Sequence, residues 1–147
     1  MDLGISVEQV VKAKFGPYLD SLPKDEAEKK LKEYVDTAKD SIQGAIDEAS
    51  GLGDSIQSTC TGIATQTPLI ISQIAGVAGS IDPAGKVSQL ATIATTVSGL
   101  KDQVKRAAAQ LGSMTNIITQ LGVDIPILGT LNTAIQTANT LLSTIPV

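Results

Sequence analysis

The sequence predicts an all-α protein, built as a long-helix bundle or a coiled-coil rod with left-handed heptad packing. Aliphatic residues recur at alternating spacings of three and four over most of the chain, which keeps one stripe of a helix facing one partner. Alternating runs typical of strands are short and lie inside these helical periods. The 147 residues include 2% aromatics and no Trp or His, so the core must be aliphatic. Small, branched side chains suit narrow seams between helices.

We treat the chain as one helical domain, 1–147, with five segments. Residues 1–20 are predicted to form a short helix and a turn. The helix has Gly16 and Pro17 at its end, and its apolar side consists of Ile5, Val7, Val10, Val11 and Phe15.

Residues 23–66 are predicted to form a long charged helix. Pro23 suits its first position, and Asp25 and Glu26 suit the positive end of the helix dipole. An apolar seam follows it, consisting of Leu31, Val35, Ala38, Ile42, Ala45, Ala49, Leu52, Ile56, Thr59 and Ile63. The seam keeps its phase across Gly51 and Gly53, which favours one helix with a weak point over two helices and a loop.

Thr67 and Pro68 indicate a new helix start or a kink. A short apolar helix is therefore predicted over 68–81, with Ile70, Ile74, Val77 and Ile81 at the same spacing.

Asp82 and Pro83 form a cap and first residue for a long heptad helix over 83–121. After a turn, an uncharged helix is predicted over 126–145. The predicted helix-packing residues of these two helices are Leu90, Ile93, Val97, Leu100, Val104, Leu111, Met114, Ile118, Leu121, Leu131, Ile135 and Leu142. Val87, Ala94, Ala108 and Ile117 widen the apolar face of the first, so we expect more than one partner helix. Both an antiparallel bundle within the chain and a rod that bundles with its copies fit this pattern.

Charge is distributed unevenly along the chain. Residues 1–54 carry 12 acids and 7 bases, whereas residues 55–147 carry 3 acids and 4 bases. The second part has instead 14 Thr, 8 Ser, 8 Gln and 3 Asn. Because Thr is a poor helix former, helices so rich in it must gain stability from packing. We infer that neighbouring molecules cover much of this part; the alternative is a monomer with a neutral surface.

The residues of catalytic and metal chemistry are scarce. A metal site would need clustered His, Cys or inward carboxylates, but the chain has no His and a single cysteine, Cys60. Cys60 has no base near it in sequence, so a small packed thiol is favoured over a nucleophile. Gly51 and Gly53 lack the third glycine and the preceding strand of a phosphate loop. We therefore expect no enzyme, no cofactor and no metal.

The net charge of −4 argues against a nucleic-acid partner. The N-terminus shows no signal-peptide pattern, and no stretch of apolar residues is long enough for a transmembrane span. We expect a protein made in the cytoplasm and incorporated into a particle.

The texture of residues 55–147 resembles the helical parts of virion and phage-tail structural proteins, in baseplates, fibre attachments or the tail interior. This resemblance in composition and periodicity implies a non-catalytic subunit whose partners are its own copies or other structural proteins. The alternative is an amphipathic coat on a lipid or granule surface, similar to phasins or exchangeable apolipoproteins. Interfacial helices usually carry more Lys, Arg and aromatics than this chain does. An enzyme or a small-ligand binder inside the bundle is a third class.

Overall fold

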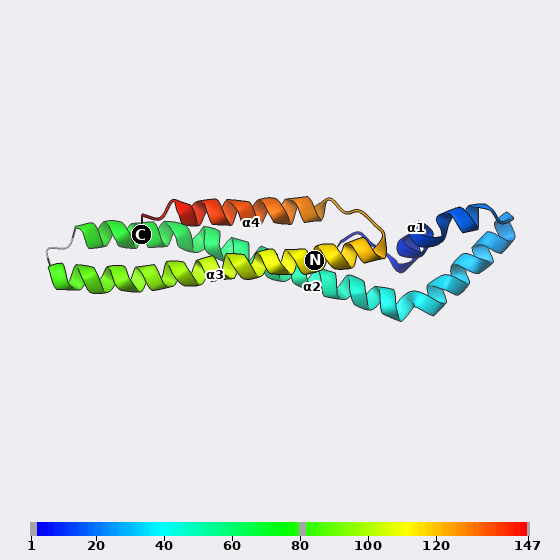
Figure 1. The fold of residues 1–147 in the computed structure, drawn as a ribbon, viewed down its shortest axis with the longest axis horizontal. Coiled ribbons are helices and arrows are strands. Elements are labelled where there is room, and N and C mark those ends of the chain that lie inside the picture. Colours follow the sequence, from blue (N-terminus) through cyan, green and yellow to red (C-terminus); the bar gives the residue numbers. More distant parts are fainter. Residues whose placement is uncertain (1–2, 80–81, 147) are drawn as a thin grey trace. The chain divides into compact units, whose positions relative to one another are not determined.

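The computed structural model describes residues 3–79 and 82–146. They form four helices, α1 (Val7–Asp20), α2 (Lys24–Ala78), α3 (Pro83–Leu121) and α4 (Ile127–Ser143) (Figure 1). The structure is 88% helix, and the described residues contain no strand. The predicted all-α class is confirmed.

The chain forms two compact units. Unit 1 consists of Met1–Asp54 and Leu111–Leu128, and unit 2 of Ser55–Gln110 and Gly129–Val147. Helices α2 and α3 each contribute residues to both units without a break in the helix.

Unit 1 contains α1, the first part of α2 and the last turns of α3. The N-terminus of α1 is capped by Ser6, whose side chain accepts a hydrogen bond of 3.2 Å from the Gln9 amide. The Phe15 ring of α1 stacks on the Tyr34 ring of α2 with 4.7 Å between centroids. The buried residues of this unit include Val10, Val11, Ile42, Ile46, Ala49, Met114, Ile118, Leu121 and Ile125.

The prediction that Gly16 and Pro17 end the first helix is wrong, because α1 continues to Asp20. Proline in a helix interior removes one backbone hydrogen bond. The last turn gains other contacts: Leu19 is buried, and the Ser21 hydroxyl donates to the Tyr18 carbonyl oxygen at 2.6 Å.

The predicted helices 23–66 and 68–81 are also a single helix, α2, which runs through Gly51, Gly53 and Pro68. Ile81 lies outside the described residues. The helix continues because Ile63, Thr67 and Ile70, all buried, keep the same phase on both sides of Pro68. The expectation that the two glycines do not break the helix is confirmed.

The buried stripe of α2 is wider than the predicted seam. Ile42, Ala49, Ile56 and Ile63 are buried as predicted. Between them the more deeply covered positions are Ile46 and Gly53, each one residue after the predicted Ala45 and Leu52, which are half-buried. Adjacent positions of a helix point about 100° apart, so α2 faces neighbours over a broad angle.

Helices α3 and α4 match their predicted ranges to within two residues. α3 ends at Leu121 and is followed by Gly122, whose φ of 74° lies in the left-handed region that Gly adopts without strain.

Within unit 2 the end of α2, the first part of α3 and α4 run side by side (Figure 1). The ends of α2 and α3 extend beyond the C-terminal end of α4. The two helices are therefore covered by α4 over only part of their length in this unit.

Replacing Pro68 by Ala should stabilise the protein by about 1–3 kcal/mol, because Ala restores the amide that the Ala64 carbonyl oxygen lacks. Pro68 is exposed, so the change removes no buried contact. The free energy of unfolding in urea measures the effect.

Pro83→Ala is the matched control, because Pro83 is the first residue of α3, where the missing amide would have no intrahelical partner. It should change the free energy of unfolding by less than about 1 kcal/mol. An unchanged or lower stability of Pro68→Ala would contradict a continuous, regularly bonded α2.

Candidate functional site

The predicted packing residues of α3 and α4 are almost all covered within a single chain. Leu111 is half-buried, and Leu90 is 40% exposed. The other ten are buried: Ile93, Val97, Leu100, Val104, Met114, Ile118, Leu121, Leu131, Ile135 and Leu142. These ten need no second molecule to shield them from water.

The two units divide these residues between them. Leu90 to Val104 and the three residues of α4 belong to unit 2, and Leu111 to Leu121 belong to unit 1. The structure therefore brings the first group together with α4 and places the second group in another core.

Two shallow grooves show which residues of unit 2 lie beside α4. On the α3 side, Ile135, Gln136 and Asn139 of α4 line one groove with four residues of α3, namely Lys101, Val104, Lys105 and Ala108. On the α2 side, Cys60, Thr61 and Ala64 line the other groove with six residues of α4. These are Thr130, Thr133, Ala134, Thr137, Ala138 and Leu141. Helix α4 therefore has two neighbours in this unit, α2 and α3.

Toward the loop that joins α2 and α3, seven positions lie fourteen residues from the seven α2 and α3 residues that line these grooves. Fourteen residues rotate a position on a straight α-helix by only about 40°. The seven positions are 74, 75 and 78 of α2 and 87, 90, 91 and 94 of α3. All seven residues are apolar, and we call them the tip face: Ile74, Ala75, Ala78, Val87, Leu90, Ala91 and Ala94.

Most residues of the tip face are exposed in the described part of the chain. Val87 is 70% exposed and Leu90 is 40% exposed. Ala75, Ala78, Ala91 and Ala94 are exposed as well, and only Ile74 is half-buried. Helix α4 ends before it reaches this part of α2 and α3 (Figure 1). These ends of α2 and α3 therefore present an exposed apolar surface.

Part of this face could be predicted from the sequence. Val87, Ala94 and Ala108 lie seven or fourteen residues apart and were expected to meet a second partner helix. Ala108 lines a groove together with α4 residues but is itself exposed. Val87 and Ala94 are exposed as well. Ile74 and Leu90 were also predicted as seam residues, whereas Ala75, Ala78 and Ala91 were missed.

A hollow with a volume of about 520 Å³ lies between the same ends of α2 and α3. Its lining is largely polar or small: Gln73, Gly76, Val77, Ser88, Gln89, Thr92 and Ile93. In the heptad repeat Gln73 and Gln89 fall on the sides of α2 and α3 away from the tip face. The two faces of the helix ends therefore differ in chemistry.

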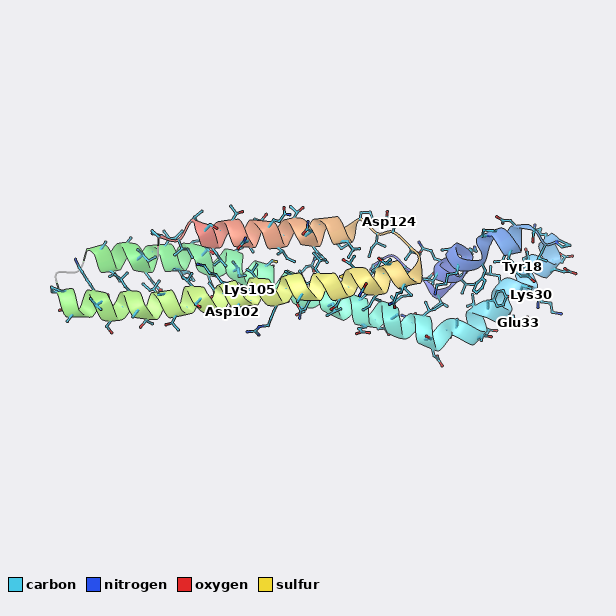
Figure 2. The ribbon with its side chains drawn as sticks, viewed as in Figure 1. Tyr18, Lys30, Glu33, Asp102, Lys105 and Asp124 are labelled. Carbon is cyan, nitrogen blue, oxygen red and sulfur yellow. The ribbon has the colours of Figure 1, made fainter. Side chains whose placement is uncertain are left out.

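Charged side chains are scarce around the tip face. Residues 69–100 contain only Asp82 and Lys86. The other charges of α3 include Asp102 and Lys105, which lie in the middle of the helix and away from the loop (Figure 2). This end of unit 2 therefore combines exposed aliphatic side chains with a net formal charge of zero.

Many threonine hydroxyls on these helices are already hydrogen-bonded to the backbone. The helix surface is therefore less polar than the number of threonines indicates. Nine threonines of the described residues donate their hydroxyl to the carbonyl oxygen four residues earlier: Thr37, Thr65, Thr67, Thr92, Thr95, Thr96, Thr115, Thr133 and Thr140. For Thr67, the one buried polar residue of the described chain, this bond of 2.7 Å satisfies the hydroxyl. At exposed positions the hydroxyl is already bonded, so covering such a side chain costs little.

Cys60 is half-buried beside α4. Burial raises the pKa of its thiol, because removal from water disfavours the thiolate. The neutral thiol therefore contributes as a small packed side chain. Among residues 3–79 and 82–146, no three His, Cys, Asp or Glu side chains are grouped so as to hold a metal ion. No helix in these ranges is both long and apolar enough to cross a membrane.

Comparison with protein-family models, with curated proteins and with solved structures finds no match to this chain.

Alkylation of Cys60 by iodoacetamide at pH 8 should be slower in the folded protein than in the urea-unfolded chain, because its raised pKa leaves less thiolate and α4 shields the sulfur. Mass spectrometry of quenched samples measures both rates. As the pH rises above the folded-state pKa of Cys60, the alkylation rates of the folded and unfolded chains should approach each other. The difference that remains is due to shielding of the sulfur by α4. Equal rates at pH 8 would contradict the position of Cys60 beside α4.

Proposed function

We propose that this chain is a non-catalytic helical subunit of a larger assembly, acting by presenting surfaces to neighbouring subunits. A virion or phage tail is the assembly that its sequence texture favours, with the subunit made in the cytoplasm and built into the particle. The observation that carries the proposal is the tip face, an exposed apolar surface on two packed helices.

Exposed apolar patches of this kind usually mark contact sites on soluble proteins. Val87 and Leu90 lie on the same helix face, three residues apart, with Ala91 and Ala94 next to them. Their exposure to water is unfavourable by roughly 25 cal/mol for each Å² of apolar surface. A subunit that meets a neighbour through this face removes that cost.

The threonine-rich surface of unit 2 supports the same function. Covering a charged side chain requires removal of its hydration, whereas a threonine already bonded to its own helix loses little. The exposed Thr92, Thr95 and Thr96 of α3 are bonded in this way. Such a surface can be covered by another protein at low cost and without matching charges.

Size fractionation of the source material tests the proposal. The native chain should migrate with a particle far larger than one chain, and should remain with it at high salt because apolar contacts are not screened. A native chain that runs at the size of one molecule would contradict it. Flotation with lipid vesicles distinguishes this proposal from the alternative of a lipid-surface coat. An assembly subunit should stay at the bottom of the gradient, whereas a coat protein should float with the vesicles.

A further inference from the structure

We propose that the groove between α3 and α4 binds residues 40–54 of a second copy of this chain, with two lysines of the groove facing the acids of that segment. Copies that meet in this way follow one another head to tail. This inference rests on the proposed function and names one of the contacts between subunits.

The groove has the chemistry of a site for an acidic helix. It has a volume of about 390 Å³ and lies within unit 2. Lys101 and Lys105 line it on the α3 side, four residues apart, and both are exposed. Neither lysine forms an ion pair with a described residue. The other residues that line the groove are uncharged: Val104, Ala108, Ile135, Gln136 and Asn139. An amphipathic groove of this kind suits a helix laid along it.

Residues 40–54 of α2 supply the complementary charge. They contain four acids and no base: Asp40, Asp47, Glu48 and Asp54. Asp40 and Asp47 lie seven residues apart, so they share one side of α2, and both are exposed. The buried residues of the same segment lie on the opposite side: Ile42, Ile46, Ala49 and Gly53. The segment is therefore packed in its own chain on one side and presents acids on the other.

The acidic side of α2 also lacks bulky side chains. Gly44 follows Asp40 by four residues, and Gly51 follows Asp47 by four, so both glycines lie on this side. A Cβ atom added at either glycine would meet no neighbouring group within 4 Å, so packing inside the chain does not require them. Because side chains are missing there, this side of the helix can lie close to the groove.

The two units carry opposite net charge. Unit 1 has Asp124 in addition to the 12 acids and 7 bases of residues 1–54. Unit 2 has two acids and four bases: Asp82, Asp102, Lys86, Lys101, Lys105 and Arg106. Unlike charges meet when unit 2 of one copy contacts unit 1 of the next, whereas like units repel. The charges therefore favour a head-to-tail order over a symmetric pair.

The contact orders the copies rather than supplying most of the binding energy. Exposed ion pairs contribute little to affinity, but complementary charges fix orientation and exclude wrong pairings. The purified chain should therefore associate weakly and in a salt-dependent way. In a particle, where many copies are held together, the same contact is reinforced.

Sedimentation velocity at high protein concentration tests the pairing. In about 0.01 M salt, where the Debye length is about 30 Å, the wild-type mass should rise above one chain, and about 0.15 M salt should reverse this. Lys105→Glu replaces an attraction by a repulsion and should weaken the association by about fivefold or more. Lys105 is exposed, so the variant should keep its helical circular dichroism and its thermal unfolding.

Arg106→Glu is the matched control. It changes the net charge by the same amount, one residue further along α3, and Arg106 is exposed but does not line the groove. Its association should stay within about twofold of the wild type.

A mixture of two variants identifies the partner segment. Asp47→Lys alone should lose association as Lys105→Glu does. When the two variants are mixed, each supplies the charge that the other has reversed, and the sites left unaltered in each still match. The mixture should therefore associate more strongly than either variant alone.

Three results would overturn the pairing: a mass of one chain at every concentration in low salt, an equal loss in Arg106→Glu and Lys105→Glu, or a mixture that associates no better than its components. Binding of the wild type but not Lys105→Glu to vesicles of anionic lipid would also overturn it, in favour of a lipid surface. If the native chain still fractionates with a large particle after any of these results, the pairing fails and the proposed function stands.

Discussion

Aliphatic side chains placed alternately four and three residues apart have to be covered, and unit 2 depends on its helices covering one another. Burial of a side chain such as Ile63, Ile93 or Leu131 contributes about 1.5–3 kcal/mol. A threonine in a helix costs only a few tenths of a kcal/mol relative to Ala. The free energy gained by burying the aliphatic stripes therefore exceeds the helix-propensity cost of the threonines between them. This gain also exceeds the roughly 3 kcal/mol that Pro68 costs in a helix interior, so α2 continues through it.

The same constraint connects the fold to the proposed function. Where α4 lies beside α3, Val104 of α3 and Ile135 of α4 are buried. Where α4 has ended, Val87, Ala91 and Ala94 of α3 are exposed. The pattern of the sequence thus continues beyond the packing that the chain itself supplies. A surface of this kind, on rigid helices and beside threonines whose hydroxyls are already bonded, suits a component that is completed by its neighbours.

The sequence alone predicted the helical class and the ranges of α3 and α4, because their caps and breaks agree with their apolar spacing. It failed at Pro17 and Pro68, where local rules predict an end but tertiary burial of Leu19 and Ile70 continues the helix. It placed Leu90 among the covered residues, although this residue is 40% exposed. Periodicity shows which side of a helix is apolar. How much of that side is buried depends on where α4 ends, which periodicity does not show. For that reason the tip face could be predicted only in part.

We infer that the apolar stripes of α2, α3 and α4 in unit 2 hold one another as one cooperative core. Native-state hydrogen exchange tests it most directly. The amides of Ile63, Leu100 and Leu131 should exchange with the same free energy of opening, and denaturant should lower all three in parallel. Rapid exchange at Leu131, while Ile63 and Leu100 remain protected, would show that α4 is not held by these stripes and would contradict the account.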